Sequence, residues 1–587
     1  MLKLFRFLRP YWWQIIILIF ATVVQVYTTL MLPALMANII NDGIVPGDID
    51  YIWATGLMMV GLALLSAAMS LVSSYFSARV GTSFARDLRT AIFTKIINFN
   101  ILDTKDFSTA SLITRTTNDV SQVQNVMIMM LVMMLRAPLF CIISIVLAIQ
   151  TAPDMSWIIL VGAAAILGSV ILIMSLVMPK FKIFQNYVDR ITLLTRENLT
   201  GLRVIRAFNN EKLEKRKFIK SNDALTKLLI FIDKILELQN PLINIIFNGT
   251  TLLCSWIGIS LLSKDFAYLG NMTAFAQYVT HVMISFLMMS MLFVTLPRAN
   301  VSAHRINDVL KKVPKINWRN KTHGVPEKSA SVEFKNVDFI YPEAEDKVLD
   351  GISFKAVAGE TTAFIGSTGS GKSTLINLVP RFYEATGGEI LVNGLPIKDY
   401  EKNDLIKRIG FVPQRGMLFA GTVKSNIKFG APDATDEQVM KAAEIAQAKN
   451  FIEKLPEKYN SHIAQGGTNV SGGQKQRLSI ARAICKNPDI FIFDDAFSAL
   501  DMKTDKRLRE ALKEITHDAV VLIVAQRIST IKDADQIIVL NNGKVVGKGK
   551  HLELLLGCPV YQEIVKSQLS DKEFAAELKL AERGNHA

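Results

Sequence analysis

The chain has 587 residues, half of them hydrophobic, and it carries a formal net charge of +14. This length excludes a single small domain, and the mean hydropathy of +0.29 is high for a soluble protein. The positive charge does not indicate a nucleic-acid partner, because Lys and Arg collect in the cytoplasmic loops of membrane proteins and no basic block with interleaved aromatic residues occurs.

The first predicted element is a membrane helix near the N-terminus. Lys3, Arg6 and Arg9 precede an apolar stretch of more than about 20 residues, at whose start lie Trp12 and Trp13. The stretch is longer than the apolar core of a cleavable signal peptide, and it lacks a small-residue cleavage site. We therefore expect it to span the membrane, with the basic residues on the cytoplasmic side and the tryptophans at the interface.

Apolar runs long enough to span a membrane recur up to about residue 300. At about 1.5 Å per helical residue, about 20 residues cross roughly 30 Å of hydrocarbon. We expect six spans, near 13–38, 53–75, 127–150, 156–178, 242–263 and 274–297. Short hairpin connections are predicted at 151–155 and 264–273, whereas the long connections 76–126 and 179–241 are polar and helical by pattern.

The charges of the connections orient these spans. The long connections are rich in Lys and Arg, whereas the first outside loop contains Asp42 and Asp48. By the positive-inside rule, the long connections and both termini are cytoplasmic. We predict a transmembrane domain over 1–315, whose helical turns near 100–110 and 200–211 contact a cytoplasmic domain. The alternative is that these turns are solvated loops.

Two features inside the spans have open interpretations. Arg136 is a charge within an apolar span, and intramembrane charges are often functional; its side chain could equally snorkel to the inner interface. Met283, Met288 and Met289 gather in the last span. Methionine makes adaptable apolar binding surfaces, and the alternative is lipid contact or packing between helices.

The rest of the chain has the pattern of a soluble α/β protein. A polar linker over 316–330 leads to segments that alternate between strand and helix over 331–570. A charged helical tail follows over 571–587.

A phosphate-binding loop follows the predicted strand 362–365. It matches the pattern G-x-x-x-x-G-K-[ST] and opens an apolar helix, which is the context that this motif requires. Its glycines let backbone N–H groups surround phosphates, Lys372 reaches the terminal phosphates, and Ser373 supplies an oxygen to Mg²⁺. The loop consists of Gly366, Ser367, Thr368, Gly369, Ser370, Gly371, Lys372, Ser373 and Thr374.

Two further segments complete the predicted nucleotide site. The apolar strand 490–493 ends in Asp494, a carboxylate that would hold Mg²⁺ through water. Before another helix lie a hydroxyl and free N–H groups that form a second phosphate-binding surface. Its residues are Ser471, Gly472, Gly473 and Gln474. ATP and Mg²⁺ are therefore the predicted cofactors.

In this order, the motifs resemble those of ATP-binding cassette (ABC) exporters, and the resemblance covers nearly the whole chain. It implies the type IV ABC transporter fold, a membrane all-α six-helix transmembrane domain fused to a cytoplasmic α/β P-loop ATP-binding cassette. It also implies that 471–474 close over ATP held by the other cassette of a dimer. Tyr341 resembles the aromatic residue that stacks on adenine, and Gln414 resembles the glutamine that links Mg²⁺ and the attacking water to the membrane loops. The segment 498–501 resembles the loop through which the two cassettes communicate.

Two positions depart from the family pattern. The glutamate that polarises the attacking water is Asp495 here, whose carboxyl group reaches about 1.3 Å less, although a general base must lie within about 2.6–3.2 Å of its proton. The histidine near the γ-phosphate is Gln526, which cannot carry a positive charge. Together, these changes resemble the degenerate-site subunit of bacterial heterodimeric multidrug-type exporters.

The resemblance implies an ATPase in a bacterial plasma membrane that exports hydrophobic or amphiphilic compounds. The partner would be a second ABC half-transporter with the intact glutamate and histidine. This chain would complete the partner's active site, while its own site is slow. The open alternatives are a siderophore-type importer with the exporter fold, a regulatory or channel-like ABC protein, and a homodimeric exporter in which Asp495 and Gln526 are working variants.

Overall fold

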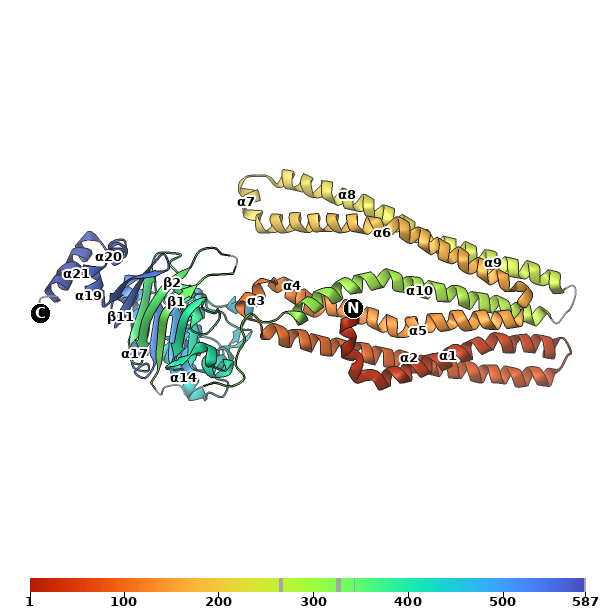
Figure 1. Cartoon of the computed structure of the whole chain (residues 1–587), viewed down its shortest axis with the longest axis horizontal. Coiled ribbons are helices and arrows are strands. Elements are labelled where there is room, and N and C mark those ends of the chain that lie inside the picture. Colours follow the sequence, from red (N-terminus) through yellow and green to blue (C-terminus); the bar gives the residue numbers. More distant parts are fainter. Residues whose placement is uncertain (263–267, 324–328, 343, 585–587) are drawn as a thin grey trace. The chain divides into compact units, whose positions relative to one another are not determined.

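The structure, a computed structural model, describes residues 1–262, 268–323, 329–342 and 344–584. The chain divides into two compact units (Figure 1). Unit 1 comprises Met1–Asn98 and Phe107–Lys312, and unit 2 comprises Phe99–Asp106 and Val313–Ala587. Parts of the linker predicted over 316–330 and the end of the tail predicted over 571–587 lie outside the described residues.

Unit 1 is built of long helices. They are α1 (Trp12–Asn38), α2 (Ile49–Ile97), α4 (Thr109–Thr114), α5 (Val120–Thr151), α6 (Ser156–Thr200), α7 (Leu202–Ala207), α8 (Glu211–Glu237), α9 (Gln239–Leu262) and α10 (Tyr268–Lys311). Short 3-10 or π turns connect or extend them: η1 (Leu2–Tyr11), η2 (Ile39–Ile44), η3 (Arg115–Asp119) and η4 (Pro153–Met155).

Within the described residues, six helical stretches are long and apolar enough to cross a membrane, which confirms the predicted architecture. They are Lys3–Ile44, Ile49–Ile97, Thr109–Thr151, Pro153–Thr200, Glu211–Ile259 and Leu269–Met289. The connection predicted at 264–273 is wrong in extent. Its residues 268–273 are the first turns of α10, because the polar Asn271 and Thr273 interrupt the hydropathy pattern without interrupting the helix; the rest of that connection lies outside the described residues.

The helices of unit 1 pack in antiparallel pairs. α1 lies along α2, α5 lies along α10, and α6 lies along α8 and α9 (Figure 1). Close approach of α2 and α5 depends on Gly81, since a Cβ atom at this position would lie 2.2 Å from Cγ1 of Ile128. Ser77 of α2 donates a hydrogen bond to the carbonyl oxygen of Ile128 at 3.2 Å, so the two helices meet almost backbone to backbone at this level.

Unit 2 contains two principal β-sheets. In the described residues, one sheet has the order β2-β1-β4-β5 and is antiparallel, and the other has the order β12-β11-β3-β10-β9-β6 and is parallel except for β12. The strands are β1 (Ser331–Phe339), β2 (Leu349–Val357), β3 (Thr361–Gly366), β4 (Gly387–Val392), β5 (Leu395–Pro396), β6 (Ile409–Val412), β7 (Gly421–Thr422), β8 (His462–Ile463), β9 (Ile490–Asp494), β10 (Val520–Val524), β11 (Gln536–Asn541) and β12 (Lys544–Gly549).

The parallel sheet is buried on both faces, which explains why its strands read as continuous apolar runs. Side chains alternate between two core clusters: Phe364 of β3 belongs to one cluster and Ile365 to the other. Helices cover the sheet: α11 (Lys372–Leu378), α12 (Lys402–Lys407), α13 (Val423–Ile427), α14 (Asp436–Ile445), α15 (Lys449–Ile452), α16 (Gly472–Cys485), α17 (Met502–Lys513), α18 (Ile528–Ile531), α19 (His551–Gly557), α20 (Pro559–Lys566) and α21 (Asp571–Gly584).

The two helical turns predicted as contact points, near 100–110 and 200–211, differ in their surroundings. The first forms α3 (Ile101–Lys105) of unit 2, where Leu102 is buried in a core cluster. Asp103 accepts a hydrogen bond from the backbone N–H of Lys315 at 3.2 Å. The second forms α7 of unit 1, none of whose residues is buried.

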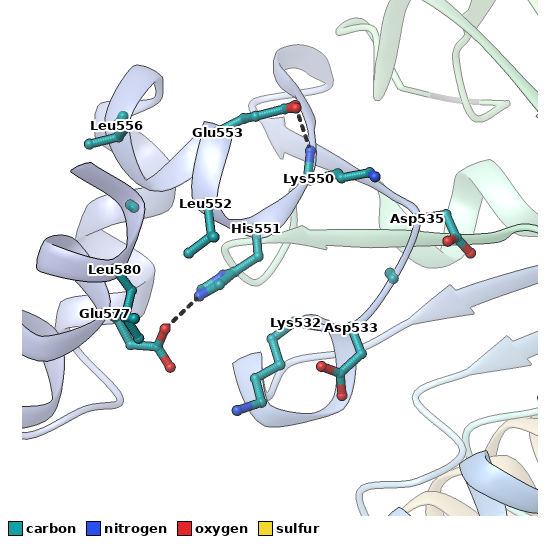
Figure 2. A pocket seen from close by; sticks show the side chains of 12 residues that line it. Lys532, Asp533, Asp535, Lys550, His551, Leu552, Glu553, Leu556, Glu577 and Leu580 are labelled. Carbon is teal, nitrogen blue, oxygen red and sulfur yellow. Dashed lines mark hydrogen bonds and ion pairs between the residues drawn. The ribbon is translucent and has the colours of Figure 1, made fainter. Parts of the chain in front are cut away.

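The predicted charged tail is the amphipathic helix α21. Ala581 is buried in a core cluster, and Phe574 and Leu578 pack against it. A cleft of about 660 Å³ lies beside the helix, lined by His551, Glu577, Lys532 and Asp533 among others (Figure 2). His551 of α19 faces Glu577 of α21 at 3.6 Å between Nε2 and Oε2 (Figure 2).

Candidate functional site

The phosphate-binding loop joins β3 to α11. Gly371, the residue before the helix, has a φ of 96°, and a Cβ atom there would lie 2.9 Å from the carbonyl oxygen of Val348 and 2.7 Å from Leu349 Cδ2. Glycine alone meets both requirements without strain. The loop can therefore pass close to the neighbouring backbone and bring its N–H groups round one opening.

A cavity of about 380 Å³ lies at this loop. It gathers most of the side chains predicted for the nucleotide site from separate segments of the chain. Its lining consists of Tyr341, Val348, Thr368, Gly369, Gly371, Lys372, Ser373, Thr374, Gln414, Asp494, Asp495, Val524 and Gln526. Gly366, Ser367 and Ser370 belong to the same loop but do not line the cavity.

Lys372 folds back on the loop. Its Nζ donates to the carbonyl oxygens of Gly366 at 2.9 Å and Ser367 at 2.7 Å. Burial lowers the pKa of Lys372, and the carboxylates of Asp495 and Asp494 oppose this effect. A half-buried ammonium group that neutral carbonyls satisfy is suited to exchange them for the oxygens of an anion.

Ser373 and Asp494 form an oxygen-rich pair on the floor of the cavity. The Ser373 hydroxyl donates to Asp494 Oδ1 at 2.8 Å. Burial, together with the neighbouring charge of Asp495, raises the pKa of Asp494. A hard cation would relieve both effects, and hydroxyl and carboxylate oxygens are the ligands that Mg²⁺ prefers. The residues present therefore fit Mg²⁺.

Two amide groups engage one oxygen of Asp495. Gln414 Nε2 donates to Oδ2 at 3.3 Å, and Gln526 Nε2 donates to the same atom at 3.1 Å. Burial raises the pKa of Asp495, while the hydrogen bonds from Gln414 and Ser498 lower it. Asp495 has a φ of 48°, and its N–H donates to the carbonyl oxygen of Val524 at 2.9 Å, so its backbone is fixed beside β10.

The backbone of the Gln526 loop is held by a residue that no motif indicated. Gln568, which follows α20, donates from Nε2 to the carbonyl oxygen of Gln526 at 2.7 Å. Its Oε1 accepts from the N–H of Ile528 at 2.8 Å. Gln568 is thus a positioning residue, and its distance along the chain from Gln526 left no local signal.

The signature segment lies elsewhere in unit 2. Ser471 caps α16 by accepting from the N–H of Gln474 at 3.3 Å, and Gln474 Oε1 accepts from the N–H of Ser471 at 2.9 Å. Ser471 and Gly472 are exposed. None of the residues Ser471, Gly472, Gly473 and Gln474 lines the cavity described above. Within this chain, the two predicted phosphate-binding surfaces are therefore not brought together.

A second residue missed by sequence analysis connects α16 with the Gln414 loop. The buried amide of Gln476 accepts from the N–H of Gly416 at 3.0 Å and donates to the carbonyl oxygen of Pro413 at 3.1 Å. Gln476 thus bonds to backbone groups before and after Gln414. The only signal available was a glutamine at a buried helical position, which is not specific.

The remaining predicted residues occupy defined places. Tyr341 lies at the cavity, its hydroxyl 3.0 Å from Thr374 Oγ1 and its ring edge-on to Tyr383. Its stacking on adenine stays a prediction. The hydroxyl of Ser498 donates to the carbonyl oxygen of Asp495 at 2.8 Å, and Asp501 caps α17 by accepting from Thr504 N at 3.0 Å.

Comparison with known proteins follows the same division of the chain. A family model described as the ABC transporter transmembrane region matches residues 15–286, and one described as ABC transporter matches residues 349–498. An uncharacterised ABC transporter ATP-binding protein of Mycobacterium tuberculosis is 37% identical over 568 residues, covering 96% of this chain and 97% of that protein. The uncharacterised ABC transporter ATP-binding protein YfiB of Bacillus subtilis is 36% identical over 568 residues, covering 97% and 98%.

A solved structure shares the fold. The structure of a bacterial Atm1-family ABC exporter with ATP bound matches with a TM-score of 0.81 and covers 95% of this chain and 99% of that chain. The sequence identity is 22%, so this likeness shows the fold.

Proposed function

The chain belongs to the ABC transporter family, and on that premise we propose that it is one subunit of an ATP-driven exporter of hydrophobic or amphiphilic compounds. Six candidate spans among the described residues, followed by one ATP-binding domain, are the architecture of a half-transporter. We propose the domain limits 1–315, 331–570 and 571–587 for membrane domain, ATP-binding domain and tail, with 316–330 as linker. Charge asymmetry between the connections supports cytoplasmic termini, and the bacterial relatives support a bacterial plasma membrane.

Residues of the cavity support binding of ATP with Mg²⁺. Lys372 would exchange its carbonyl partners for phosphate oxygens, and the loop N–H groups would surround them. The hydroxyl of Ser373 and the carboxylate of Asp494 would hold Mg²⁺, with Gln414 beside them; this ion neutralises phosphate charge during hydrolysis. Tyr341 would hold the adenine ring at the edge of the cavity.

The observation that carries the proposal is the pair of amides on Asp495. A general base needs an oxygen free to accept a proton from water. Here Oδ2 already accepts hydrogen bonds from Gln414 and Gln526, so two donors occupy this oxygen. Because aspartate is also one methylene shorter than glutamate, we propose that this site holds ATP and hydrolyses it slowly.

The exposed signature segment supports a role in a second site. Ser471 and Gly472 expose a hydroxyl and the backbone at the start of α16, away from the chain's own cavity. They suit phosphates held by another ATP-binding domain. We propose that the partner is a different half-transporter with the catalytic glutamate and histidine, and that this chain completes its active site.

The test compares ATPase rates of this chain alone with those of its mixture with a partner of that kind. We expect turnover of about 1 s⁻¹ or faster only in the mixed pair. Asp495→Glu combined with Gln526→His should add turnover at this chain's own site. The single variants Asp495→Glu and Gln526→His then separate the effect of carboxylate reach from the effect of side-chain charge.

A nucleotide-binding measurement is the control for a low rate of ATP hydrolysis by the chain alone. Nucleotide binding by the chain alone should persist, measured with a fluorescent ATP analogue, because the phosphate loop does not depend on Asp495. Full activity of the chain alone would instead make Asp495 and Gln526 working variants of a homodimeric exporter. Substrate-stimulated ATPase in the reconstituted pair distinguishes a pump from a regulatory protein.

A further inference from the structure

Arg136 of α5 lies deep within the membrane-spanning bundle. Trp13, an interfacial tryptophan, contacts Phe76 of α2 with ring centroids 6.2 Å apart, and the neighbouring Ser77 contacts Ile128 of α5. Ile128 lies at the start of the apolar run of α5, which extends from about 127 to 150. Arg136 is two helical turns farther along α5, or about 12 Å, which is close to the midplane of a hydrocarbon layer roughly 30 Å thick.

The Arg136 side chain does not snorkel to the cytoplasmic interface. Its Cζ lies 5.5 Å from the ring centroid of Phe140, which is one turn nearer the outer end of α5. A snorkelling arginine would point towards Ile128, the direction in which side chains of this helix already lean. This direction favours a charge held near the midplane over the snorkelling alternative.

Few acidic residues lie on the described helices next to Arg136. On α2, which packs against α5, they are Asp50, near its start, and Asp87, ten residues beyond Ser77. The sequences of α1 and α5 contain no Asp or Glu, and α10 contains none before Asp308. The Arg136 side chain is half-buried, and its Nε is buried with no hydrogen-bond partner among the described residues. A positive charge held inside the membrane without an anion is costly, so an anionic ligand would stabilise this position.

Polar groups surround this level of the bundle. The Phe140 ring also stacks on His281 of α10, at a centroid distance of 5.4 Å and an interplanar angle of 24°. Ser285, one turn from His281, is fully buried, and Gln25 of α1 is 4% exposed. Thr22, one turn before Gln25, contacts Ser73 of α2, so Gln25 lies at nearly the depth of Arg136. A cation, an imidazole, an amide and a hydroxyl thus share one layer.

We propose that Arg136, with Phe140 and His281 beside it and Gln25 and Ser285 at the same level of the bundle, is the recognition site for the acidic group of a transported anionic amphiphile. The inference rests on the proposed export function and narrows its substrate class. Apolar side chains above and below this layer would contact the apolar body of the ligand. A separate apolar cavity of about 280 Å³, lined by Met130, Met134 and Met289 among others, lies on another side of α5 and is not part of this site.

The test uses the reconstituted mixed pair in phosphatidylcholine vesicles and three probes with one apolar body: oleate, oleyl alcohol and oleylamine. Oleate should stimulate ATP hydrolysis in a saturable manner, and the neutral and cationic probes should not. Arg136→Gln should raise the half-saturating oleate concentration about tenfold or more, as expected for loss of a charge-assisted hydrogen bond. Arg136→Lys, which keeps the charge, should recover part of the response.

Controls separate the possible failures. Arg79→Gln removes another arginine of unit 1, which bonds to Tyr75 and lies nearer the cytoplasm, and it should leave the oleate response unchanged. Equal stimulation by all three probes, or an unchanged response of Arg136→Gln, would overturn the inference while ATP hydrolysis by the pair still supports export. If phosphatidylglycerol in the vesicles replaces oleate as the stimulating anion, the site binds a bilayer lipid and the substrate assignment is wrong. Absence of hydrolysis by the pair would contradict the proposed function itself.

Discussion

Lys372 and Ser471 both belong to phosphate-binding motifs, yet the structure gives them different surroundings. Lys372 lies in the cavity with Asp494 and Asp495, with its ammonium group held by loop carbonyls. Ser471 is exposed at the start of α16 and does not line this cavity. If the two serve different sites of a dimer, substitutions at the two positions should have unequal effects.

In the mixed pair, Ser471→Ala should lower steady-state ATP hydrolysis by about a hundredfold, because it removes a donor from the site that turns over. Lys372→Ala should lower hydrolysis only a few-fold, since it weakens nucleotide binding at the slow site. The measurement is the initial rate of phosphate release from pairs that carry each variant. The reverse order of effects would assign the fast site to this chain's own cavity.

At this scale, the sequence located the residues of the cavity but not those that hold them. The phosphate loop, Asp494 and Gln526 are local patterns next to strands, and parallel strands bring their ends to one sheet edge. Gln476 and Gln568 act through backbone atoms of distant loops. Such contacts depend on tertiary packing, so the sequence contains no motif with a fixed residue spacing that would predict them. The sequence likewise could not predict that the amides of Gln414 and Gln526 donate to the same oxygen of Asp495.

The helix α21 is an element whose docking depends on a buried imidazole. His551 Nδ1 lies 2.7 Å from the hydroxyl of Tyr561, and Nε2 faces Glu577 (Figure 2). Burial lowers the pKa of His551 from its ordinary value of 6.5, and Lys532 adds to this effect, while Glu577 and Asp533 oppose it. The folded state therefore favours the neutral imidazole.

Acidification should loosen α21. Because the unfolded state binds the His551 proton more readily, stabilisation is complete above about pH 6.5 and declines below it, down to the lowered pKa of the folded state. Hydrogen exchange of the α21 amides in the intact chain, corrected for intrinsic rates, should show less protection at about pH 5.5 than at about pH 7.5. Glu577→Gln should enlarge this difference, since it removes the carboxylate that raises the pKa of His551. The control substitution is Lys572→Gln, at an exposed position of the same helix. It should not change the difference in protection between the two pH values.

At the scale of elements, the sequence predicted the number of spans and the helical nature of the long connections. It did not predict where each membrane span ends and its cytoplasmic extension begins, because α2 continues unbroken from Ile49 to Ile97. Hydropathy falls along such a helix while its backbone hydrogen bonds continue. The separation of α3 and α7 into different units was likewise beyond the sequence, since it depends on packing of Leu102.

At the scale of the whole molecule, the exposed apolar side chains of α7 and of Phe208, which follows it, indicate a surface that a second chain covers. Val204 is 61% exposed and Phe208 is 73% exposed. In the assembled transporter, we expect the partner's ATP-binding domain to cover this face, because burial of one phenylalanine contributes about 1.5–3 kcal/mol. Phe208→Asp should therefore reduce substrate stimulation of ATP hydrolysis about tenfold, measured in the reconstituted pair.

The matched control is Lys215→Asp, a charge change on the exposed surface of α8. It should leave stimulation unchanged. A cysteine at position 208 should also lose reactivity towards a water-soluble maleimide when ATP and the partner are both present. Continued full reactivity in the assembled pair would show that α7 is solvated.

The hydrogen bond from Gln568 to the Gln526 loop affects which substitutions position 526 can accept. Gln568 bonds to the backbone carbonyl of Gln526, so the loop keeps its place whichever side chain stands at that position. Codons for histidine and glutamine differ only at the third base, as do those for aspartate and glutamate. Reversion at both positions is thus always within reach of point mutation and would not disturb the fold. If a partner supplies the fast site, as proposed, loss of that partner should favour Asp495→Glu and Gln526→His.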